Sequence, residues 1–114
     1  MATPHSVLHM KSGIVYALRC PITNETKYVG QTRVGMRHRM YCHSVTRDDR
    51  HVTRWFQIRV SLGMRPRYSI LERCCPRDLF RRERRWINFF IRKGAALLND
   101  DLKLRKNKRD GRLK

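Results

Sequence analysis

The order of apolar and polar positions changes from strand-like to helical spacing along the chain. Residues 13–20, GIVYALRC, alternate and are rich in β-forming residues, and residues 27–32, KYVGQT, resume the same pattern. Between them, residues 21–25, PITNE, carry the Pro, Thr and Asn that are typical of turns. These three segments predict a β-hairpin.

Helical spacing follows the hairpin. Met36, Met40 and His43 recur at i, i+4 and i+7, which predicts one buried face of a helix over residues 36–45. Residues 51–63, HVTRWFQIRVSLG, have the same kind of apolar spacing and end in glycine, a residue that commonly closes a helix. The sequence therefore predicts two helices directly after the hairpin.

A third strand and a last helix complete the expected fold. Residues 67–72, RYSILE, predict a short strand, and Pro76 begins a long helix that runs to about Arg92, with Gly94 just beyond. The order of elements is then β-β-α-α-β-α, followed by a basic tail. This order predicts an α/β chain of the α+β type, in which helices flank a small three-stranded sheet that is mixed or antiparallel.

The charge balance points to a polyanionic partner. The sequence has 27 Lys and Arg residues against 9 Asp and Glu, which gives a net charge of +18. A compact domain with that charge repels itself unless a polyanion neutralises it, and nucleic acid is the first candidate. With 114 residues and 40% hydrophobic content, the chain fits one domain over residues 1–100 and a basic tail over residues 101–114.

An anionic membrane surface is the rival partner, but the sequence offers little that could insert. The most apolar stretch, residues 86–91, is only six residues long and contains Asn88. The N-terminus lacks the charged start and the apolar run of a secretory signal. We therefore expect no membrane partner and a cytoplasmic protein.

The cysteines do not suggest a metal module. Cys20, Cys42, Cys74 and Cys75 form no CxxC pair, and adjacent cysteines rarely bind one metal ion. We expect reduced thiols, and the spacing of Cys and His residues argues against a structural zinc module.

One carboxylate stands out in the last helix. At about 100° per residue, the apolar residues of the segment 76–92 fall within an arc about 140° wide. They are Leu79, Phe80, Trp86, Ile87, Phe90 and Ile91. Glu83 lies near the centre of this arc. A carboxylate directed at a core must be paired, protonated or bound to a cation, so Glu83 is either the partner of an arginine or a ligand for a hard ion such as Mg²⁺. Periodicity alone does not separate these alternatives.

Four other residues have ordinary explanations when each is taken alone. Tyr16 and Tyr28 are common strand residues, and packing is their default role. His43 faces the same way as Met40, and Arg39 would be one more solvated charge. Only their joint arrangement suggests a site.

The hairpin sequences GIVY and KYVGQT resemble the paired signature that gives the GIY-YIG nucleases their name. The likeness extends to the next helix, where Arg39 and His43 match an Arg-x-x-x-His motif of that family. It continues in the last helix, where Glu83 stands in a Glu-x-x-Trp-Ile context, and ends at a matching asparagine, Asn99. The match covers residues 13 to about 99, and these motifs in the family's order are far more specific than any one of them.

The chain departs from the family at its first tripeptide. Alignment on Gly13 places Val15 in the position that the family gives to tyrosine. Alignment on Tyr16 instead leaves eleven residues before Tyr28, which is within the family's spacing. We therefore take Tyr16 as the equivalent residue.

The resemblance implies metal-dependent hydrolysis of phosphodiester bonds. Mg²⁺ or Mn²⁺ would be held by Glu83, Tyr16 would orient or deprotonate the attacking water, and Arg39 would bind the scissile phosphate. The remaining matched residues would complete the hydrogen-bond network, relay a proton or support the metal helix. The catalytic residues expected in this way are Tyr16, Tyr28, Arg39, His43, Glu83 and Asn99.

Phosphate contacts are expected along the basic surface. The residues expected to bind nucleic acid are Lys27, Gln31, Thr32, Arg37, Arg65, Arg67 and Lys103. Such contacts position a backbone without reading its sequence, so we expect little base specificity. The expected substrate is DNA, with RNA left open. The alternative is a basic nucleic-acid-binding module without catalysis, which the charge alone would satisfy but which does not explain Glu83.

Overall fold

The predicted hairpin forms in the computed structural model, which describes residues 12–100. Strand β1 (Gly13–Arg19) pairs antiparallel with β2 (Thr26–Thr32). The turn between them is closed by a hydrogen bond from the Asn24 N–H to the Cys20 carbonyl oxygen at 2.8 Å. Asn24 has a φ of 64°, a left-handed conformation that asparagine tolerates better than most residues. The turn residues therefore act as the sequence pattern indicates.

The third strand joins the other side of β1. Strand β3 (Arg67–Cys74) pairs antiparallel with β1, so the sheet order is β2-β1-β3 and the sheet is antiparallel rather than mixed. The strand is two residues longer than its apolar pattern indicated, because it continues through Arg73 to Cys74. As the central strand, β1 is almost entirely buried, and β2 and β3 are the edges.

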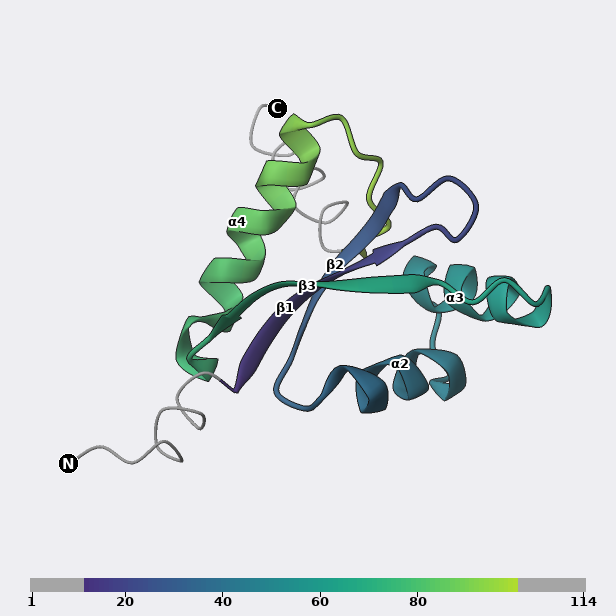
Figure 1. Cartoon of the computed structure of the whole chain (residues 1–114), viewed down its shortest axis with the longest axis horizontal. Coiled ribbons are helices and arrows are strands. Elements are labelled where there is room, and N and C mark those ends of the chain that lie inside the picture. The colour runs from purple at the N-terminus through teal and green to yellow at the C-terminus, as the bar shows by residue number, and fades with distance from the viewer. Residues whose placement is uncertain (1–11, 101–114) are drawn as a thin grey trace, which may run out of the picture.

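Two helices cover one face of the sheet. These are α2 (Met36–Val45) and α3 (His51–Ser61), which follow the hairpin as predicted (Figure 1). Gly63 ends α3 with a φ of 75°, and the Met64 N–H bonds the Arg59 carbonyl at 2.8 Å, as in a Schellman motif. The buried residues that these helices share with the sheet are Ile14, Tyr16, Leu18, Tyr28, Met36, Met40, Val52 and Phe56.

The last helix covers the opposite face. A 3-10 turn (Pro76–Asp78) precedes α4 (Leu79–Arg92), so the proline begins a tighter turn and not the α-helix itself. Leu79 and Ile87 of α4 pack with Val15 and Val29, whose side chains point away from α2 and α3. Figure 1 shows α4 and the α2–α3 pair on opposite sides of the strands.

The predicted apolar arc of α4 is wider than the face that is buried. Phe80 is 67% exposed and Ile91 is 45% exposed, whereas Leu79 and Ile87 are buried. A narrow sheet covers only the strip of helix that faces it, which is centred on positions 79, 83 and 87. Phe80 and Ile91, at the rim of the arc, therefore remain exposed to solvent.

The segment after α4 returns to the free edge of β2. The Leu98 N–H bonds the Lys27 carbonyl oxygen at 2.6 Å. Asn99 bonds both backbone groups of Val29, accepting from its N–H at 3.2 Å and donating to its carbonyl at 2.7 Å. Asp100 pairs with His51 at the first turn of α3, where a carboxylate is favoured by the helix dipole. This segment therefore ties the sheet edge to α3.

Three further expectations concern the membrane, the cysteines and the basic tail. Within residues 12–100 no helix is long and apolar enough to cross a bilayer. The four cysteines all lie in this range and form no disulfide. The predicted basic tail, residues 101–114, lies outside the described residues.

Replacement of Asn99 by alanine should loosen the edge of the sheet. The change removes two hydrogen bonds and leaves the buried backbone groups of Val29 without them, which should lower the free energy of unfolding by about 1–3 kcal/mol. Urea denaturation measures this. Asn88→Ala, at an exposed position of α4, is the matched control and should change stability by less than about 0.5 kcal/mol. Equal effects of the two changes would show that Asn99 does not hold the edge.

Candidate active site

The hydroxyl of Tyr16 is the meeting point of the predicted residues. Tyr16 lies in the middle of β1 with 0% of its surface exposed. Its oxygen accepts a hydrogen bond from Arg39 Nε at 2.9 Å and lies 2.8 Å from His43 Nε2. The centroid of the Tyr28 ring is 6.3 Å from that of the Tyr16 ring and 5.8 Å from that of the His43 ring. The structure thus brings four of the six expected catalytic residues together.

A glycine makes this approach possible. Gly30 stands opposite Tyr16 in the β1–β2 register. A Cβ atom at Gly30 would lie 2.6 Å from the Tyr16 hydroxyl oxygen and 2.6 Å from the Tyr28 ring, closer than carbon atoms come to such neighbours in proteins. The glycine of the KYVG segment therefore leaves room for both tyrosine rings.

Helix α2 supplies the two partners of Tyr16. Arg39 and His43 are four residues apart, so they lie on the same side of the helix. The His43 ring stacks on Phe56 of α3, with centroids 5.3 Å apart and planes 20° from parallel. Phe56 was part of the apolar spacing of α3, but nothing in the sequence showed that it supports His43.

Burial opposes the phenolate that a water-activating tyrosine would need. It raises the pKa of Tyr16 well above the ordinary 10.0, and the nearby Tyr28 raises it further. Arg39 acts in the opposite direction but does not compensate. Tyr16 therefore carries its proton at neutral pH in the protein without a bound metal.

His43 is held in its neutral form. Burial lowers its pKa to about 4, and the positive charge of Arg39 contributes in the same direction. Because Tyr16 accepts from Arg39, its own proton can be donated to His43 Nε2, which assigns the histidine proton to Nδ1. Nδ1 is buried and has no hydrogen-bond partner among residues 12–100. Such orphaned groups are uncommon in cores and often mark functional sites.

Glu83 lies on the other side of the sheet from this cluster. It belongs to α4, between the buried Leu79 and Ile87, but it is only half-buried. Gln31 Nε2 donates to its Oε1 at 3.4 Å. Gln31 follows Gly30 in the edge strand β2, so one strand carries the contacts of Glu83 on one face and those of Tyr16 on the other.

The oxygen donors at Glu83 fit a hard divalent ion. Mg²⁺ commonly uses one or two carboxylates and keeps several waters, which requires a carboxylate that solvent can reach. Glu83 meets that condition, and the side-chain amide of Gln31 lies beside it, with its nitrogen toward the carboxylate. Residues 12–100 contain no cluster of three or more His, Cys, Asp or Glu side chains that could hold a metal ion.

A second carboxylate anchors α4 and was not anticipated. Glu72 of β3 accepts hydrogen bonds from Arg82 Nε at 2.9 Å and from Trp86 Nε1 at 3.0 Å. Its ion pair with the Arg82 guanidinium measures 2.8 Å. The apolar arc of α4 gave no sign of this contact, because Trp86 lies at the border of that arc and Arg82 lies outside it.

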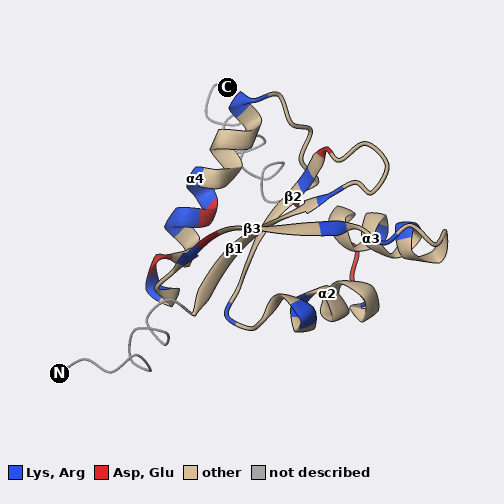
Figure 2. Cartoon of the chain, viewed as in Figure 1, with Lys and Arg blue, Asp and Glu red and all other residues tan. Residues whose placement is uncertain are grey.

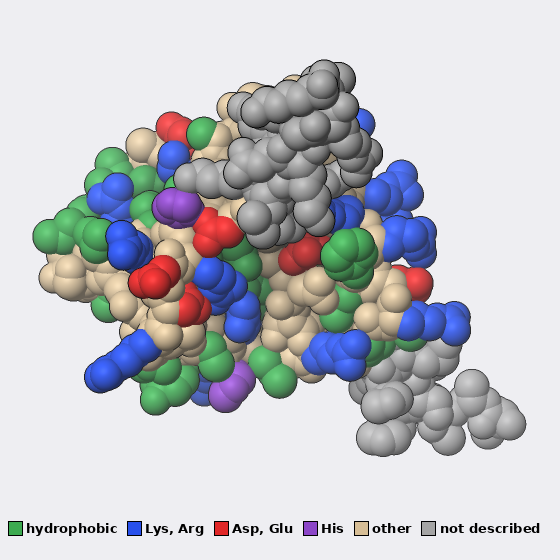
Figure 3. All heavy atoms as spheres, turned by 180° about the vertical axis from the view of Figure 1, so that it is seen from behind, with side chains coloured by type: hydrophobic (Ala, Val, Ile, Leu, Met, Phe, Trp, Pro, Cys, Tyr) green, Lys and Arg blue, Asp and Glu red, His purple; other side chains and the backbone are tan. Residues whose placement is uncertain are grey.

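The residues expected to bind nucleic acid divide into two groups. Arg37, Arg65 and Arg67 are exposed, and Lys and Arg lie along the helices on both faces (Figure 2). From behind, positive side chains surround the visible face, with carboxylates among them (Figure 3).

The second group has structural contacts instead. Thr32 is buried, and its hydroxyl accepts a hydrogen bond from the Val34 N–H at 3.1 Å, so it is placed to shape the turn rather than to meet a ligand. Gln31 is turned toward Glu83, and Lys27 is half-buried and pairs with Glu25 at 3.7 Å. Lys103 lies outside the described residues.

Asn99 also has a structural place. Its bonds to the Val29 backbone fix the part of β2 that lies between Tyr28 and Gly30. Asn99 is therefore a positioning residue, because its hydrogen bonds go to the backbone of the strand that carries Tyr28 and Gly30.

Comparisons of the chain with protein-family models, with curated proteins and with solved structures found no match.

The low pKa of His43 makes stability depend on pH. The folded value of about 4 lies below the ordinary 6.5, so the unfolded chain binds this proton more readily. The contribution is present above about pH 6.5 and is lost as the pH falls toward 4. Urea denaturation at a series of pH values should show that the free energy of unfolding falls less steeply with decreasing pH in His43→Gln than in the wild type. His38→Gln, at an exposed position of α2, should keep the wild-type slope. The same slope in both variants would contradict the assignment.

Proposed function

We propose that this protein is a metal-dependent endonuclease of the GIY-YIG type that hydrolyses phosphodiester bonds in DNA. The observation that carries the proposal is the Tyr16 hydroxyl, held between Arg39 Nε and His43 Nε2 with Tyr28 beside it. These are four residues that the resemblance names, and they come from two strands and a helix. A chain that only binds nucleic acid has no need to bury such a network.

Arg39 is suited to hold the scissile phosphate. Its hydrogen bond to Tyr16 uses Nε, so the two terminal nitrogens remain to form a planar fork on phosphate oxygens. The side chain is half-buried, which strengthens its interaction with an anion relative to a fully solvated guanidinium. A phosphate bound by Arg39 lies next to the Tyr16 hydroxyl.

The protonation states of Tyr16 and His43 favour a relay. Tyr16 is neutral and His43 has an unprotonated Nε2, so a water proton can pass to the Tyr16 oxygen as the phenolic proton passes to His43. The phenol is regenerated, the histidine becomes the imidazolium, and the hydroxide attacks phosphorus as the bond to the leaving 3′ oxygen breaks. Because Tyr16 is buried, this relay requires Arg39 to move toward the phosphate and admit the water.

Glu83 would hold the metal, with Gln31 beside it. When bound, Mg²⁺ or Mn²⁺ supplies Lewis acidity at the phosphate and the leaving oxygen. Support for a shared site comes from β2, because Tyr28 and Gly30 face the Tyr16 cluster and Gln31 faces Glu83. The substrate strand would therefore cross the edge of the sheet beside Gly30 and Gln31, next to the part of β2 that Leu98 and Asn99 cover.

The tyrosine test is cleavage by Tyr16→Phe. The change keeps the ring and removes the hydroxyl that links Arg39 to His43, so the single-turnover rate on a DNA oligonucleotide in Mg²⁺ should fall by at least about a hundredfold. Tyr41→Phe, on the exposed side of α2, is the control and should cleave as the wild type does. Unchanged cleavage by Tyr16→Phe would remove the hydroxyl from the mechanism.

The metal test uses Glu83→Gln. The amide keeps the shape of the side chain but lacks the charge that a divalent ion needs, so cleavage should collapse while DNA affinity holds or rises. Titration calorimetry with Mg²⁺ and Mn²⁺ gives a readout independent of activity, and it should show ion binding that the variant loses. Glu25→Gln, in the exposed hairpin turn, should retain both properties. If Glu83→Gln binds the ions and cleaves normally, Glu83 does not hold the metal.

A further inference from the structure

A groove opens between the edge strand β3 and helix α2, and none of the six expected catalytic residues lines it. Its volume is about 520 Å³, within the range of about 300–1,000 Å³ that is usual for ligand sites. All of its charged lining residues are arginines: Arg19, Arg37, Arg65 and Arg67. Tyr68 and Met40 lie between them.

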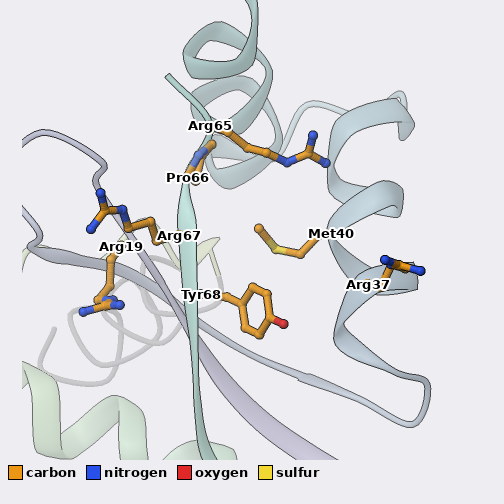
Figure 4. Close-up of a pocket in the computed structure, with 7 residues that line it drawn as sticks. All are labelled: Arg19, Arg37, Met40, Arg65, Pro66, Arg67 and Tyr68. Carbon is orange, nitrogen blue, oxygen red and sulfur yellow. The ribbon is translucent and has the colours of Figure 1, made fainter. Parts of the chain in front are cut away.

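The groove presents an aromatic side chain and a cation together. Tyr68 projects from β3 and Met40 from α2, so that they face each other, and Arg65 reaches across above them toward α2 (Figure 4). Arg37 points outward from α2, and Arg19 and Arg67 lie on the other side of β3. Tyr68 is 43% exposed, so part of its surface is open to a ligand.

The register of the sheet places this groove beside the Tyr16 cluster. Tyr68 pairs with Leu18, and Ile70 pairs with Tyr16, so Tyr68 is on the same face of the sheet as Tyr16. Leu18 and Tyr16 are about 7 Å apart along the strand, which is about twice the rise of about 3.4 Å per nucleotide in a stacked nucleic-acid strand. On the helix side, Met40 directly follows Arg39.

The combination of arginines and an aromatic ring in the groove favours an unpaired nucleotide over a simple phosphate or a duplex. A simple phosphate would need only the arginines, and a duplex keeps its base faces stacked inside, where Tyr68 cannot reach them. An unpaired nucleotide offers a phosphate for an arginine and a flat base for an aromatic ring, and base stacking on such a ring is a usual mode of single-strand binding. Met40 adds a polarisable apolar surface opposite the ring.

We propose that this groove binds an unpaired nucleotide of the substrate strand, with its base on Tyr68 and its phosphate on Arg65. The inference rests on the proposed function in one respect, because it takes the strand to be the one cleaved near Tyr16. It adds a substrate class: nucleic acid with a single-stranded or unpaired position next to the cleavage site.

The test compares binding of a single-stranded DNA oligonucleotide with binding of a duplex of the same length, in chelator so that nothing is cleaved. Tyr68→Ala should weaken single-strand binding about tenfold or more and leave duplex binding nearly unchanged. Tyr68→Phe should bind as the wild type does, because the ring remains. Arg65→Ala should reduce the slope of log K against log salt by about one for the single strand.

Several outcomes would overturn the inference. An equal effect of Tyr68→Ala on both ligands, or no effect on either, would show that the ring does not hold a base. If Tyr68→Ala gives either result while the wild type still cleaves DNA in Mg²⁺, only the assignment of the groove fails. If the wild type binds neither ligand, the groove assignment and the proposed function fail together.

Discussion

Gly30 stands opposite Tyr16 in the hairpin, and the tyrosine hydroxyl fills the space that a Cβ atom at this position would take. This close approach lets the Tyr16 ring lie against β2, where its oxygen meets Arg39 and His43 from α2. It also brings the Tyr28 ring next to both. Helix α2 and the Phe56 ring that stacks on His43 keep the other groups in place. The candidate site nevertheless depends on Gly30, because any side chain there would occupy the space of the tyrosine rings.

The same burial that fixes the geometry also determines the charges. It raises the pKa of Tyr16 and lowers that of His43, so two potentially ionic groups remain neutral beside a charged guanidinium. Arg39 is then the single charge of the cluster, and a phosphate is its natural counterion. A bound phosphate would also reduce the repulsion that Arg39 exerts on an imidazolium at His43, which makes proton transfer to His43 easier with substrate than without it.

Local patterns predicted the elements well, because strand alternation, helical spacing and helix-ending glycines are properties of neighbouring residues. They also placed Met36, Met40 and His43 on one buried face. Contacts between distant segments were harder to predict. Asn99 and Val29 are 70 positions apart, and Glu72 meets Arg82 only after β3 and α4 have packed, so no periodicity reports either contact. The raised pKa of Tyr16 could not be predicted for a related reason, since the sequence shows nearby charge but not the extent of burial.

The most direct test of the central claim is incubation of supercoiled plasmid DNA with the wild-type protein in Mg²⁺, in Mn²⁺ and in chelator. We expect nicked or linear plasmid with either ion and intact plasmid in chelator, because the neutral Tyr16–His43 pair needs a Lewis acid to make water reactive. A protein that binds the plasmid in every condition and leaves it intact in both ions would be a basic nucleic-acid-binding module and not a nuclease.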